Sequence, residues 1–171
     1  YTVTIMEDKE RYKHLNKYLK EKFGERTLKI CIDGGFTCPN RDGTLSTSGW
    51  IFCSEKGSGE LIRCGSGDTI TEKISNQVKN YFNSYRSERA NKFIAYFQNF
   101  TNTYDTIQNL KEKYDSALID DRIVGLDIAT RPDCIDENVA KLISIYIPKY
   151  KVFVELGLQT SNDSTGSLIN R

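Results

Sequence analysis

The sequence predicts an α/β fold in which a parallel sheet is built from repeated strand–helix (βα) units that follow an N-terminal helix. Apolar, strand-like runs alternate four times with segments of helical periodicity, the last of them cut short. These runs are nearly continuous, as expected for strands that are buried on both faces of a parallel sheet. With 171 residues, of which 38% are hydrophobic, the chain is long enough for one core. We therefore predict a single domain over residues 1–171.

The first predicted element is an amphipathic helix over residues 7–23. Apolar side chains recur there at steps of three and four residues, and Gly24 supplies a residue suited to ending a helix. A short apolar run over 28–32 is the first candidate strand.

A glycine-rich segment over residues 34–68 interrupts the regular pattern. It holds eight of the 12 glycines, the three cysteines Cys38, Cys53 and Cys64, and the aromatic residues Trp50 and Phe52. A loop of this length inside a compact domain is usually functional or disordered. Its aromatic and cysteine content is too high for a disordered linker, so we predict a functional loop.

The next helix begins at Thr69, because Thr69 and Glu72 have the spacing of a capping box. Its apolar stripe runs from Ile70 to Tyr85. The remaining predicted elements are a strand over 92–98, a helix over 105–114 with Ile107 and Leu110 inward, a strand over 122–129, a helix capped by Asp136 and ended by Pro148, a strand over 151–158, and a loop leading into a helix over 161–171.

Charge and hydropathy give no sign of a nucleic-acid or membrane partner. Lys and Arg number 24 and Asp and Glu 23, so no net charge attracts RNA or an anionic surface. No apolar run approaches the roughly 20 residues of a membrane span, and the first ten residues do not resemble a secretion signal. These features predict a cytoplasmic protein without membrane contact.

The cysteines favour metal or redox chemistry over a disulfide scaffold. Five are present, which is an odd number, and three lie in the glycine-rich loop. We expect Cys31 and Cys134, outside the loop, to be small buried hydrophobes.

Polar residues collect where the predicted strands end. Gln98 and Asn102 follow the second strand, Arg131 follows the third, and Gln159 follows the fourth. The carboxyl ends of parallel strands meet at one edge of the sheet, which is where such folds place their functional groups. Glu155 interrupts the apolar run of the fourth strand, and a buried carboxylate is costly unless it is paired. A site at this edge is therefore predicted.

The ordered motifs resemble an uncharacterised bacterial family of radical S-adenosylmethionine (SAM) enzymes, related to the elongator catalytic subunit and to oxygen-independent coproporphyrinogen oxidase. The resemblance covers nearly all of the chain, and its matching segments are residues 35–43, 51–53, 96–98, 101–104, 128–134 and 154–160. The resemblance implies a barrel of six βα units, of which this chain would supply about four. The expected architecture is thus a partial TIM-type barrel.

The resemblance also implies two cofactors, a [4Fe–4S] cluster and SAM. The family pattern C-x11-C-x2-C holds the cluster by three thiolates and leaves one iron open for SAM, which the reduced cluster cleaves to a 5′-deoxyadenosyl radical. Cys38 matches the first ligand and Cys53 the third, but the second position is Trp50. An indole has an N–H donor and no free lone pair for iron.

The resemblance also assigns other residues of this chain to SAM binding. Phe52 matches the aromatic residue between the last two cysteines, and Glu155 matches a position expected to bond SAM. The remaining assignments to cofactor binding are Gln98, Asn102, Arg131 and Gln159.

The sequence supports three functional hypotheses. The first is a radical SAM enzyme, impaired by Trp50 and by the shortened barrel, with tRNA or a small molecule as its substrate. The second is a non-catalytic binding module on the same scaffold, with RNA or a protein as its partner. The third, with the weakest signal, is a zinc or redox-thiol protein that uses Cys38 and Cys53. The fourth strand would also be an open edge, which favours self-association.

Overall fold

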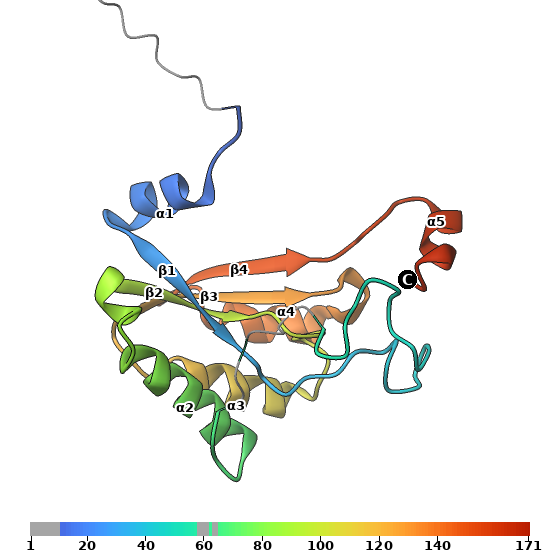
Figure 1. The fold of residues 1–171 in the computed structure, drawn as a ribbon, viewed down its shortest axis with the longest axis horizontal. Coiled ribbons are helices and arrows are strands. Elements are labelled where there is room, and N and C mark those ends of the chain that lie inside the picture. Colours follow the sequence, from blue (N-terminus) through green and yellow to red (C-terminus); the bar gives the residue numbers. More distant parts are fainter. Residues whose placement is uncertain (1–10, 58–61, 63–64) are drawn as a thin grey trace, which may run out of the picture.

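The computed structural model describes residues 11–57, 62 and 65–171, and it contains one parallel four-stranded sheet in the order β1-β2-β3-β4 (Figure 1). The strands are β1 Thr27–Ile32, β2 Lys92–Phe97, β3 Ile123–Thr130 and β4 Lys151–Leu156. Each strand pairs in parallel with the next one along the chain. Within the described residues the sheet does not close into a barrel, and β1 and β4 are its edges. The predicted α/β fold with a partial βα repeat is confirmed.

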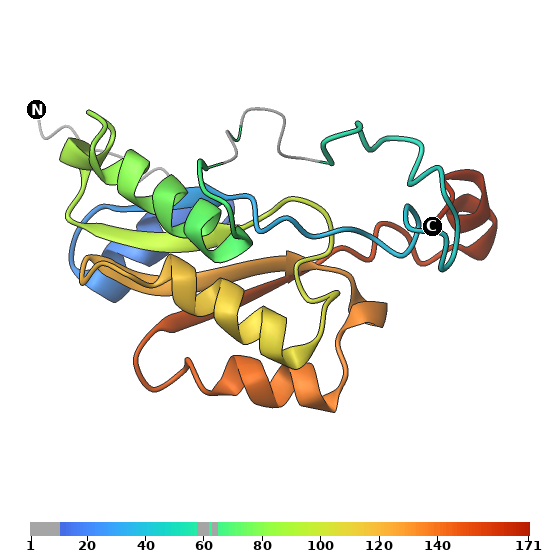
Figure 2. The same ribbon diagram turned by 90° about the horizontal axis from the view of Figure 1, so that it is seen from below.

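Three helices cover one face of the sheet, as Figure 2 shows from below. They are α2 Ile70–Phe82, α3 Ile107–Ala117 and α4 Glu137–Ser144. The helix α1, Leu15–Phe23, lies on the opposite side, where Tyr18 meets Phe153 of β4 edge-on at 6.2 Å between ring centroids. Two short 3-10 turns, Ser87–Arg89 and Pro132–Cys134, and α5, Asp163–Leu168, complete the described elements.

The hydrophobic core lies between the sheet and α2 to α4. Phe93 and Phe97 of β2 are fully buried, as are Leu126 of β3 and Tyr114 of α3. Tyr114 also donates its hydroxyl to the carbonyl of Asn102 at 2.6 Å. This bond fixes the segment that follows β2 against the covering helices.

The N-terminal helix is shorter than the sequence predicts. Residues 7–10 lie outside the described part of the chain, and 11–14 are not helical. The helix begins at Leu15 because His14 has extended backbone and its Nδ1 accepts the N–H of Asn16 at 3.2 Å. A side chain that accepts this bond caps the helix and ends its propagation toward the N-terminus.

Helix boundaries elsewhere are partly confirmed. The Thr69–Glu72 capping box is present, with both of its reciprocal hydrogen bonds. However, α2 ends at Phe82, so Tyr85 lies beyond the helix and is 69% exposed. The prediction that Ile107 points inward is wrong, because it is the first residue of α3 and is exposed.

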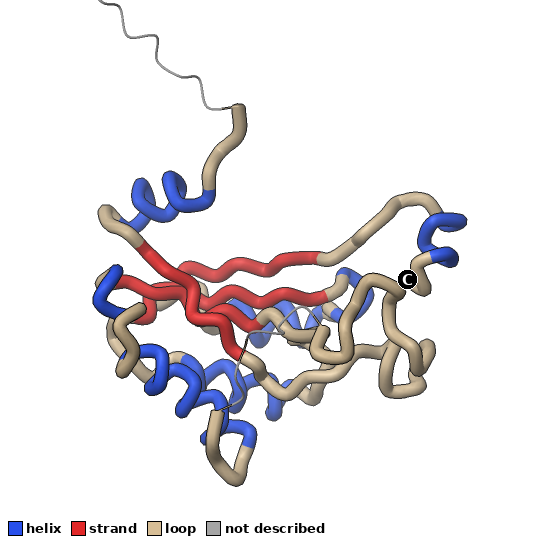
Figure 3. The backbone as a smooth tube through the Cα atoms, viewed as in Figure 1, coloured by secondary structure: helices blue, strands red, loops and turns tan. Residues whose placement is uncertain are grey.

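The glycine-rich loop joins β1 to α2, and its described residues form no helix or strand beyond one isolated bridge between Ser54 and Gly57 (Figure 3). It extends past the carboxyl ends of the strands, where α5 also lies (Figure 1). Cys64 is outside the described residues. Among the helices described, none has both the length and the apolar character needed to cross a bilayer.

Candidate functional site

The candidate site lies at the carboxyl ends of the strands, where three segments are tied together. The N–H of Thr101, after β2, donates to the carbonyl of Thr37 at 3.1 Å. The N–H of Ile51, in the glycine-rich loop, donates to the carbonyl of Ile169 at 3.2 Å. The loop is therefore anchored both to the end of β2 and to the segment after α5.

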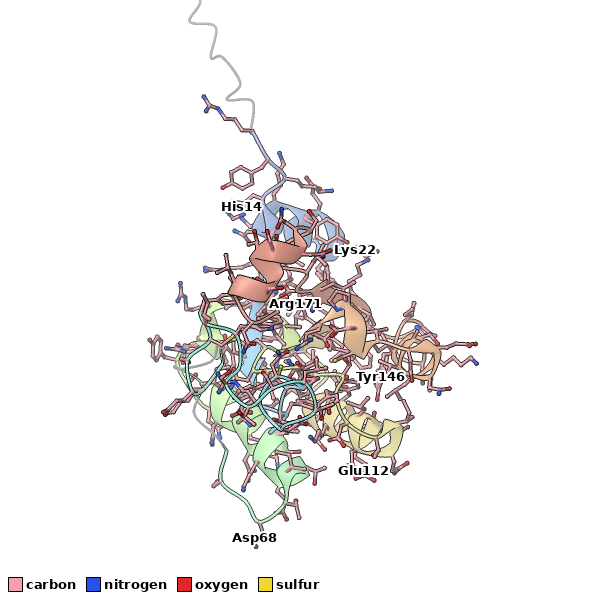
Figure 4. The ribbon with its side chains drawn as sticks, turned by 90° about the vertical axis from the view of Figure 1, so that its right-hand side faces the viewer. His14, Lys22, Asp68, Glu112, Tyr146 and Arg171 are labelled. Carbon is pink, nitrogen blue, oxygen red and sulfur yellow. The ribbon has the colours of Figure 1, made fainter. Side chains whose placement is uncertain are left out.

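Trp50 lies at the centre of this arrangement. The guanidinium carbons of Arg131 and Arg171 lie 5.3 Å and 5.5 Å from its ring centroid, and Phe52 packs against it at 5.5 Å between centroids. Figure 4 looks onto this end of the molecule, with Arg171 labelled beside α5. Guanidinium groups at this range are attracted to the indole by cation–π interaction. The Nε1 of Trp50 is buried and has no hydrogen-bond partner among the described residues.

Arg131 connects Trp50 to the first cysteine. Its Nη1 donates to Cys38 Sγ at 3.4 Å and also to Asn40 Oδ1, while its Nε donates to Asp133 Oδ1 at 3.0 Å. Burial alone would lower the pKa of Arg131, but its bonds to Asp133 and Cys38 outweigh this and raise it. The same guanidinium lowers the pKa of Asp133. Arg131 is 3% exposed, so its N–H groups donate to acceptors within the protein.

A second arginine, Arg41, is hydrogen-bonded to residues 53–55 of the glycine-rich loop. Arg41 donates to the carbonyls of Ser54, of Cys53 at 3.4 Å and of Glu55 at 3.3 Å. Gly49 has a φ of +70°, and a Cβ there would lie 2.9 Å from Arg41 Nε. Glycine is thus required at the residue before Trp50, both for its backbone conformation and for the approach of Arg41.

The donor set does not fit a [4Fe–4S] cluster held by three protein thiolates. Burial raises the pKa of the Cys53 thiol, which disfavours its thiolate form. The second ligand position is the indole of Trp50. Across residues 11–57, 62 and 65–171, no group of three or more His, Cys, Asp or Glu side chains is placed to hold a metal ion.

Glu155 belongs to a different cluster, on the sheet face that α2 to α4 leave uncovered. Its carboxylate accepts from Lys29 Nζ and from the hydroxyl of Tyr96, both at 2.8 Å. Lys29 Nζ also lies 2.6 Å from Asp127 Oδ2, whose carboxylate is 1% exposed. Sequence reasoning missed these three partners, although Lys29 and Asp127 interrupt apolar strands in the same way as Glu155.

Burial and hydrogen bonds within this cluster shift the pKa values of Glu155, Tyr96 and Asp127. Burial alone would raise the pKa of Glu155, but its bonds to Lys29 and Tyr96 lower it. Burial, together with the bond to Glu155, raises the pKa of Tyr96 and keeps its phenol protonated. Burial also raises the pKa of Asp127, whose Oδ1 has no partner among the described residues.

The other predicted contacts lie in separate environments. Asn102 is fully buried and donates to the carbonyl of Ala129 at 2.7 Å, which makes it a link between the ends of β2 and β3. Gln98 directly follows β2 and is partly buried. Gln159, with a φ of +72°, lies near Gly157, where a Cβ would be 2.9 Å from Gln159 Nε2 and 3.9 Å from the Trp50 ring. Phe52 therefore lies beside Trp50 and Gln159 beside Gly157, whereas Asn102 is buried.

The expectation that Cys31 and Cys134 are buried is not met. Cys31 is exposed and Cys134 is half-buried. Partial burial still raises the pKa of Cys134 to about 11, so its thiol stays protonated at neutral pH.

Comparison with known proteins finds relatives in bacteria and in an archaeon. The chain is 44% identical over 161 residues to the uncharacterized protein YtqA of Bacillus subtilis, covering 94% of this chain and 49% of YtqA. It is 38% identical over 154 residues to the protein YhcC of Escherichia coli, covering 90% and 47%. It is 32% identical over 156 residues to the uncharacterized protein MJ0486 of Methanocaldococcus jannaschii, covering 90% and 46%.

The chain thus spans about half the length of the curated relatives it matches. No family model matches it. No solved structure matches it either.

Proposed function

We propose that the chain is a radical SAM-type scaffold that has become a non-catalytic binding module. Its cluster loop is held closed by packing around Trp50 rather than by iron and sulfide. The resemblance of its motifs supports the radical SAM ancestry. The loss of cluster chemistry rests on one observation, the packing of the half-buried Trp50 against Arg131 and Arg171 at the second cysteine position.

The residues that the resemblance assigns to SAM are engaged within the protein, which supports the same conclusion. Glu155 is bonded to Lys29 and Tyr96, and Arg131 is bonded to Asp133, Asn40 and Cys38. Arg131 is buried, and a buried charged group that already has partners gains little from a ligand unless those bonds are broken. The Glu155 side chain is 46% exposed, so this holds less strongly for Glu155.

The partner that fits this end of the molecule is a protein. Apolar side chains are exposed there on the loop and around α5, namely those of Ile51, Phe52, Leu158 and Leu168. Exposed apolar residues that gather at one end mark a protein contact surface. The formal net charge of +1 gives no electrostatic support to RNA binding.

Anaerobic reconstitution with iron and sulfide tests the loss of the cluster. We expect the wild-type chain to retain far fewer than the roughly four irons of a cluster, and Trp50→Cys to take up more iron and to gain visible absorbance. Trp50→Phe is the matched control, because it removes the indole without adding a thiol. It should behave like the wild type.

Two outcomes would contradict the proposal. Four irons bound to the wild-type chain, with cleavage of SAM, would mean that another side chain replaces the missing thiolate. Equal iron uptake by Trp50→Phe and Trp50→Cys would mean that the indole blocks the site only by its size.

A further inference from the structure

One lysine is shared by two carboxylates on the sheet face that α2 to α4 leave uncovered. Lys29 Nζ lies 2.6 Å from Asp127 Oδ2 and 2.8 Å from Glu155 Oε1. Lys29 belongs to β1 and Glu155 to β4, so their contact reaches across β2 and β3. When both carboxylates are ionised, they carry one more negative charge than Lys29 can balance.

The excess charge falls on Asp127. Its side chain is 1% exposed, and its Oδ1 has no hydrogen-bond partner in the part of the chain that the structure describes. Glu155 is more exposed and also accepts from the hydroxyl of Tyr96. Burial raises the pKa of Asp127, whereas at Glu155 the effect of burial is outweighed by the bonds to Lys29 and Tyr96, which lower its pKa. When two carboxylates share a site, the buried one with fewer partners takes up the proton.

The other titratable side chains near Asp127 do not supply the missing charge. Cys31 and Tyr96 are in register with Asp127 across the sheet, but neither forms a cation. Lys151 Nζ lies 5.6 Å from the ring of Phe153 instead. On α1, the side that packs on this ring presents Tyr18. The charged residues of α1 are exposed, namely Lys17, Lys20, Glu21 and Lys22. A proton on Asp127 is therefore what balances the cluster.

The chain beyond Glu155 is tied to the Trp50 loop. Gly157 lies next to the indole, because a Cβ there would be 3.9 Å from the Trp50 ring. Further on, Asn170 Nδ2 donates to the carbonyl of Gly49 at 2.6 Å. A change in how Glu155 is held at the end of β4 is thus passed to the residues around Trp50.

We propose that Lys29, Asp127 and Glu155 form a proton-operated latch between β1 and β4. With a proton on Asp127, Lys29 and Glu155 are a balanced pair that joins the two strands across the sheet face. When Asp127 loses this proton, its carboxylate repels that of Glu155 and competes for the same ammonium group, so β4 and the Trp50 loop are held less firmly. The latch does not depend on the loss of cluster chemistry proposed above.

The pH dependence of stability tests whether Asp127 takes up the proton. Its pKa in the folded chain is raised above the unfolded value of about 3.9, so its contribution is complete below that value and is lost as pH rises through the folded value. Asp127→Asn has the same shape and cannot ionise. Its midpoint in urea should therefore increase relative to the wild type between about pH 4 and about pH 8. Asp121→Asn, at an exposed position, should follow the wild type.

Acrylamide quenching of Trp50, the single tryptophan, tests the link to the loop. Quenching of the wild type should increase over the same pH range, and quenching of Asp127→Asn should not. Glu155→Gln is a second, independent variant: it removes the competing carboxylate, so Asp127 keeps Lys29 and the pH dependence of both measurements should become smaller.

Two results would overturn the proposal. A wild-type urea midpoint that changes with pH in the same way as that of Asp127→Asn would mean that Asp127 takes up no proton in the folded chain. A difference in stability between these two chains without any pH dependence of Trp50 quenching would mean that the proton acts within the cluster alone and that no latch reaches the loop.

Discussion

At the residue scale, the account depends on what surrounds Trp50. The sequence identifies position 50 as the place where a cysteine is expected, since Cys38 and Cys53 frame it at the spacing of the motif. It does not predict the two arginines around the ring. Arg131 follows β3 and Arg171 follows α5, and only the folded chain brings them to the loop. Contacts of this kind have no local sequence signal.

The Arg131–Asp133 bond predicts a specific pH dependence of stability. The pKa of Asp133 is lowered in the folded chain, so its contribution is present above the unfolded value of about 3.9 and is lost as pH falls through the folded value. Asp133→Asn should therefore reduce the loss of unfolding free energy between pH 5.5 and pH 3, as measured by urea titration at each pH.

The control for this prediction is Asp163→Asn, at the exposed first residue of α5. Because Arg131 does not contact this carboxylate, the variant should follow the wild-type pH profile. An Asp133→Asn profile that is as steep as the wild type would mean that the Arg131–Asp133 bond adds nothing to stability.

At the element scale, helix starts were predicted better than helix lengths. The caps Thr69 and Asp136 are local signals and both are present. The C-terminal end of α2 and the start of α1 differ from the prediction, because apolar periodicity continues through Tyr85 and through residues that are not helical. Periodicity reports which side chains could share a face, and tertiary packing decides which of them do.

The capping box of α2 can be tested by two substitutions. Thr69→Ala removes the acceptor for the Glu72 N–H and should lower the free energy of unfolding by about 1 kcal/mol in urea titration. Glu72→Gln keeps a side chain that can accept the N–H of Thr69, so it should cost less. Equal losses in the two variants would mean that the charge of Glu72 at the helix N-terminus, rather than the bond to Thr69, is the larger contribution.

At the scale of the whole molecule, the parallel sheet and its strand order follow from the sequence pattern. Continuous apolar strands alternate with amphipathic helices, and right-handed βα connections leave few arrangements for such a chain. The assignment of site residues to SAM stays a prediction. The partners of Glu155, Lys29 and Tyr96, could not be found from the sequence, because they come from two other strands and strand register is not visible in a single sequence.

The fluorescence of Trp50 tests the central claim most directly, because it is the single tryptophan of the chain. Emission would be recorded anaerobically before and after addition of iron and sulfide. The account predicts the emission of a partly buried indole in the metal-free protein, unchanged by the addition. Emission typical of a solvent-exposed indole, or quenching that develops together with visible absorbance, would contradict it. Either result would mean that the loop is not closed around Trp50 and that it remains available to a cluster.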